Sequence, residues 1–453
     1  MSSPAVAPLD SYARRPKLPP GYRPRRGLNW GIVGLMYTSY YLCRYNLSLA
    51  NKSIAEEFHF TKSNMSDIIA AQLFAYAIGQ AVNGLLTDRL GGKRAMLIGA
   101  AGTVTMNLFF GAASFWGLLW LFILLRGLDG YSQSFGAPGF IKINAAWFSQ
   151  NERGTFAGIF GFMINLGRLG IFKLGPALLG GFVFLGMWQV PPLHWRWLFW
   201  IPAAVASLVA VVLALVVKDT PEEAGFHGVH KGESDHDDLD VHGEIAVVFK
   251  QITTNRVVWI IAAAYACTGA VRQTIDQWFP RYLQEVHHLD MASNIFQWTG
   301  FLIPFVASAG SLLSGFISDR FFGGRRAPVA MGVYSVELAV ILVASQVHGA
   351  MAVAAAFVAI SFTANATHSL LGPAAAMDIG GRKMAGFASG CIDAFQYLGA
   401  GIAIQILGRV LDRTGYTYFF YYMIPFAVIG AALMYTIAHR RSLKKEVFAP
   451  QKP

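Results

Sequence analysis

Charged residues are scarce in this chain of 453 residues, since Asp, Glu, Lys and Arg together make up only 13% of it. Soluble domains contain about 25% charged residues, whereas 55% of this chain is apolar. A soluble core does not account for so much apolar sequence. The composition therefore predicts a membrane protein.

Cysteine is also rare, and Cys43, Cys267 and Cys391 all fall within apolar segments. This placement argues against a disulfide framework. The first 26 residues are rich in Pro, Ser and Arg and lack the apolar core of a cleavable signal. The sequence also lacks a nucleophile–base constellation, a glycine-rich phosphate loop and metal-spaced ligands. We therefore expect no enzyme, no cofactor and no metal site.

Apolar stretches of about 20 residues, long enough to cross a bilayer, recur along the chain. We expect an all-α integral membrane protein with twelve transmembrane helices near residues 29–49, 66–87, 95–114, 117–141, 154–186, 197–217, 257–280, 293–318, 327–345, 350–377, 384–411 and 416–438. The fifth stretch exceeds one span and is rich in glycine, which predicts a bend or a tilt.

Basic residues concentrate in alternate loops and in both terminal segments, which predicts that both termini are cytoplasmic. Basic loops that face anionic lipid account for the net charge of +11 without nucleic acid. The long polar stretch between spans six and seven contains His and Asp but no standard metal-ligand spacing. The expected division is a basic cytoplasmic tail (1–28), an N-terminal six-helix half (29–217), a cytoplasmic linker (218–256), a C-terminal six-helix half (257–438) and a cytoplasmic tail (439–453).

A charged hairpin is repeated between spans two and three and between spans eight and nine. Its residues are Gly84, Asp88, Arg89, Gly91, Lys93 and Arg94 in the first copy and Gly315, Asp319 and Arg320 in the second. Asp88 and Asp319 lie 231 positions apart, close to half the chain. The repeat predicts a carrier built from two similar halves.

Six basic residues lie within or near the apolar spans: Arg44, Arg126, Lys142, Arg168, Lys173 and Arg272. Charges inside a membrane are costly and usually face a partner or a water-filled path. Arg126 has Asp129 nearby as a structural partner, and Lys142 is placed to reach the surface. Arg168 and Lys173 remain candidates either to line a site or to pair with Asp276 or Asp393.

Arg44 and Arg272 are 228 positions apart, nearly the offset of the repeated hairpin. The duplication therefore places one guanidinium in each half, facing the same interface. Two planar, permanently charged groups suit a phosphate or a carboxylate. A phosphate monoester carries about −1.5 to −2 charges, which would roughly neutralise the pair.

The first hairpin, DRLGGKR, resembles the signature of the major facilitator superfamily. Further stretches resemble its organophosphate:phosphate antiporter family, the bacterial glycerol-phosphate and hexose-phosphate carriers: residues 40–46 (YYLCRYN), 147–154 (WFSQNERG), 219–222 (DTPE), 276–286 (DQWFPRYLQEV) and 397–399 (YLG). The resemblance covers nearly the whole chain. It implies the major facilitator fold, with two pseudo-symmetric halves.

By this resemblance, Arg44 and Arg272 match the two substrate-binding arginines of the family. Pocket positions of the family fall on Tyr37, Tyr41, Tyr76, Asn165 and Tyr397. Tyr45 and Gln80 stand where the family has lysines, Ile164 where it has a histidine, and Pro304 where it has an acidic residue; Arg168 and Asp393 are additions. The loss of two ammonium groups predicts a substrate of lower charge or a zwitterion.

The predicted function is secondary active transport of a small organic anion, a phosphate ester or phosphonate, in exchange for inorganic phosphate. The protein would act as a monomer in a bacterial inner membrane. Asp276 and Asp393 are the candidates for proton coupling, with His368 a weaker one. A membrane sensor of a phosphorylated metabolite and a proton-coupled carboxylate transporter remain alternatives.

Overall fold

The computed structural model describes residues 18–148, 153–184, 187–227, 229 and 254–439, without the side chains of 153–160, 184, 373–389 and 391. The first half contains α1 (Tyr22–Phe58), α2 (Lys62–Leu90), α3 (Gly92–Ala113), α4 (Leu119–Gln133), α5 (Gly136–Trp147), α6 (Arg153–Gly180) and α7 (Trp197–Val216). After the short helix η2 (Glu222–Ala224), the second half contains α9 (Arg256–Val286), α10 (Asn294–Phe322), α11 (Arg326–Ala344), α12 (Ala350–Leu371), α13 (Pro373–Thr414), η3 (Tyr421–Met423) and α14 (Ile424–His439).

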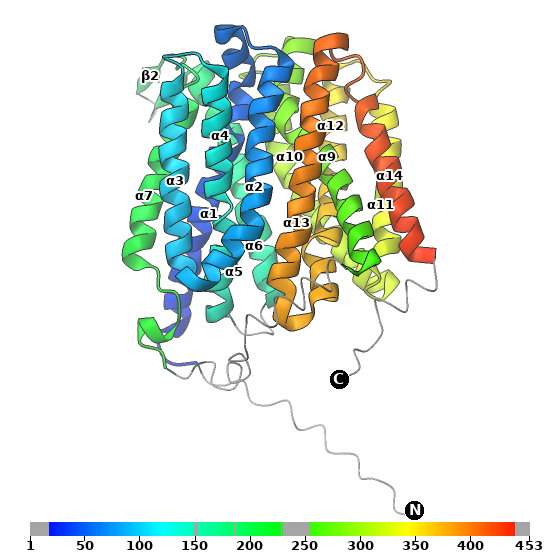
Figure 1. Cartoon of the computed structure of the whole chain (residues 1–453). Coiled ribbons are helices and arrows are strands. Elements are labelled where there is room, and N and C mark those ends of the chain that lie inside the picture. Colours follow the sequence, from blue (N-terminus) through cyan, green and yellow to red (C-terminus); the bar gives the residue numbers. More distant parts are fainter. Residues whose placement is uncertain (1–17, 149–152, 185–186, 228, 230–253, 440–453) are drawn as a thin grey trace, which may run out of the picture.

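The helices run side by side as one bundle, with α2 and α13 at its middle, α3 and α7 at one edge, and α11 and α14 at the other (Figure 1). Helix α1 begins and α14 ends at the same end of the bundle. Large apolar side chains on the edge helices are exposed, including Leu208 and Leu215 on α7 and Val343 on α11. Such surfaces are suited to lipid.

Among the described residues, the halves meet mainly through three helix pairs: α1 with α9, α2 with α13, and α6 with α10. The Tyr45 hydroxyl donates to Asp276 at 3.4 Å, and these residues are 231 positions apart. The Arg281 guanidinium donates to Asn51 at 2.8 Å, across 230 positions. Both spacings match the offset of the repeated hairpin. The same levels of α1 and α9 therefore meet across the interface, which agrees with the predicted pseudo-symmetry.

Nine helices in the described part of the chain are long and apolar enough to span a membrane. Helices α1 and α9 do not meet this criterion although they contain 37 and 31 residues. They carry Arg44, Arg272 and Asp276, which are buried between the halves. Polar residues that face protein lower the hydropathy of a helix without exposing charge to lipid.

The fourth predicted span, 117–141, is two helices rather than one. Helix α4 ends at Gln133 and α5 begins at Gly136. Pro138 lies in the first turn of α5 and has no N–H to donate to the carbonyl of Ser134, four residues earlier. The proline therefore explains the break.

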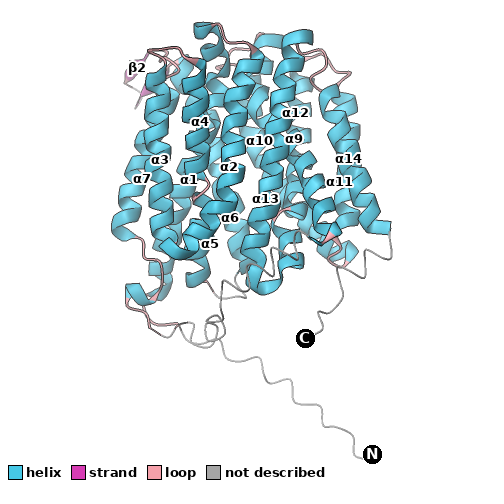
Figure 2. Cartoon of the chain, in the orientation of Figure 1, coloured by secondary structure: helices cyan, strands magenta, loops and turns pink. Residues whose placement is uncertain are grey.

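Two other predicted boundaries were wrong. The fifth span, predicted to extend to residue 186, is helical only to Gly180, and an antiparallel hairpin of β1 (Phe182–Phe184) and β2 (Trp188–Val190) follows (Figure 2). The predicted loop at 378–383 lies within α13, because Pro373 at the start of α13 moves the helix boundary to residue 372. The side chain of Cys391 and most of the polar linker lie outside the described residues.

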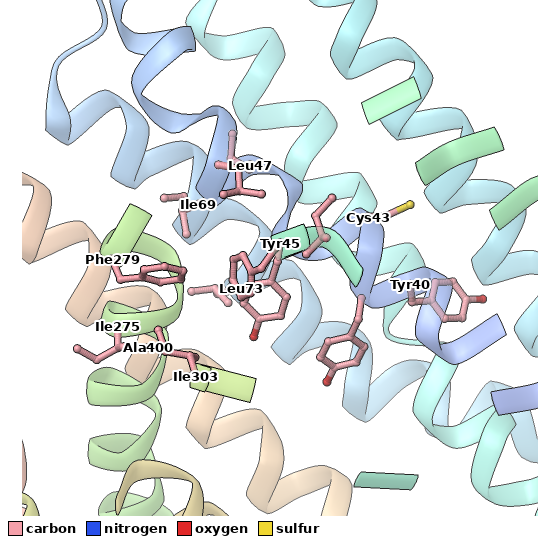
Figure 3. Packing of buried hydrophobic residues seen from close by; sticks show 14 of the residues in the cluster. Tyr40, Cys43, Tyr45, Leu47, Ile69, Leu73, Ile275, Phe279, Ile303 and Ala400 are labelled. Carbon is pink, nitrogen blue, oxygen red and sulfur yellow. The ribbon is translucent and has the colours of Figure 1, made fainter. Parts of the chain in front are cut away.

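An apolar layer crosses the bundle between α1, α2, α9, α10 and α13. Figure 3 shows Ile275 and Phe279 of α9 close to Tyr45 of α1 and Leu73 of α2. The Phe172 and Phe279 rings contact each other at 5.1 Å between centroids, which joins α6 to α9. Its residues follow Arg44 along α1 and Arg272 along α9, so this layer lies toward the end of the bundle opposite the termini.

Candidate functional site

Arg44 lies on α1 at the interface between the halves and is only 3% exposed. Its Nε donates to Gln133 Oε1 at 2.8 Å, and Nη1 donates to the Tyr397 hydroxyl at 3.2 Å. Both partners are neutral, and its Nη2 atom has no hydrogen-bond partner within the described residues. Arg44 is therefore a buried cation with an unused donor.

Tyrosines surround this guanidinium. It lies over the rings of Tyr41 and Tyr76, at 4.6 Å and 4.3 Å from their centroids. The rings of Tyr76 and Tyr397 are 4.4 Å apart, so tyrosines of both halves meet at Arg44. Tyr37 packs against Tyr41 at 5.5 Å, one layer further out. Aromatic faces stabilise a desolvated cation while their hydroxyls offer further hydrogen bonds.

A polar network within the first half positions Arg44. Arg126 pairs with Asp129 at 3.1 Å and also donates to the backbone carbonyls of Cys43 and Arg44. Asp129 in turn accepts at 3.0 Å from Gln133, the residue that holds Arg44. The predicted Arg126–Asp129 pair is thus confirmed, and it supports Arg44 from behind.

Arg272, the equivalent residue of α9, is 4% exposed. Its Nε is 4.0 Å from Asp276 Oδ2, and this Nε has no hydrogen-bond partner in the described part of the chain. Asp276 forms its main ion pair with Arg168 of α6, and both side chains are almost completely buried. Arg168 was predicted either to line a site or to pair with Asp276 or Asp393, and in the structure it pairs with Asp276. Tyr45, at a lysine position of the family, also donates to this carboxylate.

Asp393 of α13 lies between the two arginines. With the Gln396 amide oriented to satisfy both of its neighbours, Gln396 donates to Asp393 at 3.1 Å and accepts from Arg272 at 3.1 Å. Gln80 and Tyr265 donate to the same carboxylate at 3.3 Å and 3.2 Å. Asp393 is therefore linked to Arg272 through one carboxamide.

Three residues from the sequence analysis do not contact Arg44 among the described contacts. Asn165 joins α6 to α10 by donating to Ser308 at 2.6 Å, and it accepts from Arg168 at 3.3 Å. His368 contacts the Tyr265 hydroxyl at 2.6 Å, next to Asp393. Lys173 is exposed and lies 5.7 Å from the Phe301 ring, rather than pairing with either predicted acid.

The first copy of the repeated hairpin is held within its own half. Lys142 donates to the carbonyls of Thr87 and Asp88 at 3.2 Å and 2.6 Å, and pairs with the Asp88 carboxylate at 3.5 Å. It thereby caps the last turn of α2. Asp219, from the predicted DTPE stretch, accepts from the Lys93 N–H at 2.7 Å at the start of α3. Burial raises the pKa of Asp219, although this hydrogen bond opposes the rise.

The turn itself depends on Gly91, whose φ of 86° is in the left-handed region. In the second copy, Asp319 and Arg320 are exposed, and no ion pair joins them to another described side chain. The remaining hairpin residues differ in exposure: Arg89 and Arg94 are exposed, whereas Gly84 and Gly315 are half-buried. The two copies thus share sequence but differ in their contacts.

Residues 33–404 match the family model described as Major Facilitator Superfamily. The chain belongs to this superfamily. It is accordingly a multi-pass membrane protein, as its composition predicted.

Similar proteins include glycerol-3-phosphate and hexose phosphate transporters and a membrane sensor protein. The chain is 27% identical over 411 residues to the glycerol-3-phosphate transporter of Bacillus subtilis, covering 88% of this chain and 89% of that protein. It is 28% identical over 457 residues to the membrane sensor protein UhpC of Salmonella typhimurium, covering 96% of both. A crystal structure of a bacterial homolog of the human lysosomal transporter Spinster has a TM-score of 0.75 at 17% identity, covering 94% of this chain and 99% of that one. These findings confirm the predicted family resemblance and the major facilitator fold.

In this superfamily member, polar contacts close the interface at the end opposite the termini. Asp412, late in α13, accepts from the N–H groups of Lys62 and Ser63 at 2.8 Å and 2.9 Å, at the start of α2. Lys62 also pairs with Glu285 of α9 at 3.5 Å. We call Lys62, Ser63, Glu285 and Asp412 the latch. Together with the apolar layer, it separates Arg44 from this end of the bundle.

Several residues that complete the site were not singled out as functional candidates by the sequence. Gln133 and Gln396 hold Arg44 and Arg272, yet a glutamine in a helix carries no charge signal. Tyr265 is seven positions before Arg272 on the same helix, a spacing that places both on one face. That spacing was the available signal for it.

Proposed function

We propose that this chain is a secondary carrier that moves a small phosphate ester or phosphonate by alternating access, in exchange for inorganic phosphate. The observation that carries the proposal is the pair Arg44 and Arg272. These residues lie on equivalent helices of the two halves, are buried at the interface, and each has a donor nitrogen without a partner among the described residues. A buried, incompletely paired guanidinium is costly, and an oxyanion relieves that cost.

The proposed site comprises Arg44, Arg272 and the surrounding Tyr37, Tyr41, Tyr76 and Tyr397. Arg168 and Asn165 support it from α6, through Asp276 and Ser308. The hairpin residues act in the conformational change. If protons are coupled, Asp393 is the better candidate, because Asp276 is already paired with Arg168.

The bacterial relatives support a bacterial inner membrane. The distribution of basic residues supports a cytoplasmic location for both termini. In that orientation the latch is on the periplasmic side. We also propose that the chain is divided at the domain limits given above and that it acts as a monomer.

Counterflow in proteoliposomes tests the proposal. Liposomes loaded with inorganic phosphate are offered labelled glycerol 3-phosphate, an alkylphosphonate or a carboxylate, and uptake should require internal phosphate. Arg44→Lys and Arg272→Lys should each lower uptake about tenfold or more, because lysine loses the planar fork of donors. The matched control is Arg409→Lys, a half-exposed arginine of α13 that pairs with Asp67.

Each outcome decides a separate part of the proposal. Uptake that does not depend on internal phosphate contradicts exchange. Normal uptake by both lysine variants contradicts the two-arginine site. Binding without flux favours a sensor, the alternative suggested by the 28% identity to UhpC over 96% of both chains.

A further inference from the structure

The charged groups buried between the halves do not balance. Among the described residues, Arg44, Arg168, Arg272 and Asp276 are buried there and Asp393 is half-buried; Arg281 is also buried at the interface, but it is paired with Glu285. Arg168 and Asp276 compensate each other. Arg44, Arg272 and Asp393 remain, with a net charge of +1 if both acids are ionised. A substrate with a net charge of −1 would neutralise them.

The position of Asp393 points to the form of that substrate. A phosphoryl dianion held by Arg44 and Arg272 would use both positive charges and leave Asp393 as a half-buried anion without a counter-charge. Its direct partners are the neutral side chains of Gln80, Tyr265 and Gln396. Such a carboxylate needs a cation or a proton, and a cation carried by the substrate meets that need.

The surroundings of Asp393 also suit an ammonium group. Tyr265 donates to the carboxylate directly. Electrostatic interactions also link Asp393 with Tyr76 and Tyr397. Carboxylates and aromatic faces are the groups with which proteins hold ammonium ions. The Gln396 amide bridges Asp393 and Arg272, so the proposed anion and cation positions are separated by one carboxamide.

We propose, resting on the proposed carrier function, that the substrate is a short zwitterion that carries a phosphate or phosphonate and an amino group. Its phosphoryl oxygens bind Arg44 and Arg272, and its ammonium binds Asp393. The single carboxamide between the two positions favours a chain of two or three carbons. This arrangement gives Asp393, an addition relative to the family pattern, a role in selecting the substrate.

The test is competition against counterflow of labelled inorganic phosphate, with matched pairs of unlabelled compounds. Ethanolamine phosphate is compared with propyl phosphate, and 2-aminoethylphosphonate with propylphosphonate. The wild-type protein should bind each amino compound roughly tenfold to a hundredfold more tightly than its partner, as expected for one added charge-assisted hydrogen bond. Equal competition within both pairs overturns the proposal without any variant.

The variant Asp393→Asn should abolish or reverse this preference ratio. Glu337→Gln is the matched control, since Glu337 is a fully buried carboxylate of α11 outside the site, and it should keep the wild-type ratio. Protection against thermal unfolding by inorganic phosphate verifies that each variant is folded. An unchanged ratio in folded Asp393→Asn refutes the role of Asp393.

The same experiment separates this inference from the proposed function. If no phosphoryl compound competes and phosphate does not exchange, the carrier proposal fails. If the compounds compete but the amino group has no effect, only the zwitterion inference fails. If a phosphate diester of net charge −1, such as glycerophosphoglycerol, competes better than the amino compounds, the charge count holds but the assignment of Asp393 is wrong.

Discussion

Replacement of Asp276 by asparagine should destabilise the protein strongly. The Asp276 and Arg168 side chains are 1% and 0% exposed, and they form an ion pair between α9 and α6. Asparagine keeps the shape of the side chain but leaves the Arg168 charge buried without its counter-ion. Breaking one side of a buried ion pair costs roughly 3–5 kcal/mol. The Tyr45 hydroxyl and Arg272 lose a charged neighbour in the same step.

A double-mutant cycle measures this effect. The four proteins are wild type, Arg168→Leu, Asp276→Leu and the variant with both leucines, compared by denaturant unfolding in lipid bicelles. Because replacing both charges with apolar residues is often neutral, the double variant should recover most of the stability lost by Asp276→Leu. The expected coupling energy is roughly 3 kcal/mol, the upper part of the range for residues in contact.

The matched control for Asp276→Asn is Asp67→Asn. Asp67 pairs with Arg409 at 3.5 Å, but these side chains are 26% and 53% exposed. An exposed pair contributes about 0–1 kcal/mol, so this variant should unfold almost as the wild type does. If Asp276→Asn proved no more destabilising than Asp67→Asn, the Arg168–Asp276 pair could not be the compensated buried pair described above.

Two further changes test the hairpin and the latch end of the interface. Lys142→Met removes the cap on the last turn of α2 and the pair with Asp88, so it should lower the unfolding free energy by about 1 kcal/mol; no change in denaturant midpoint would contradict the cap. In Gly408→Ala, the added Cβ would collide with Ser66 Oγ and approach the Lys62 carbonyl to 2.9 Å. It should separate α13 from α2 and speed modification of a cysteine introduced at Leu73 by a water-soluble thiol reagent, whereas unchanged modification would contradict tight closure there.

The sequence predicted the register of the two halves better than it predicted contacts between them. Arg44 and Arg272 could be matched because a duplication preserves spacing along the chain. The sequence could not decide whether Arg168 pairs with Asp276 or with Asp393. The distance from Arg168 to each carboxylate depends on how the two halves pack together. The predicted helix limits were wrong near Pro138 and Pro373, where a proline interrupts an apolar run. Apolar periodicity alone does not register a missing N–H donor.

The pairing of Arg168 with Asp276 bears on the physical basis of the proposed exchange. If all three arginines were uncompensated, an empty carrier would have to close over three buried cations. In the described structure, Asp276 compensates Arg168, whereas Arg44 has neutral hydrogen-bond partners that include Gln133 and Tyr397. The barrier to closing without substrate would then depend mainly on Arg44 and Arg272, each of which has a donor nitrogen without a partner among the described residues. On the proposed mechanism, a substrate needs to supply only the charge that these arginines and their neighbours lack, so exchange should be sensitive to the net charge of the cargo as well as to its phosphoryl group.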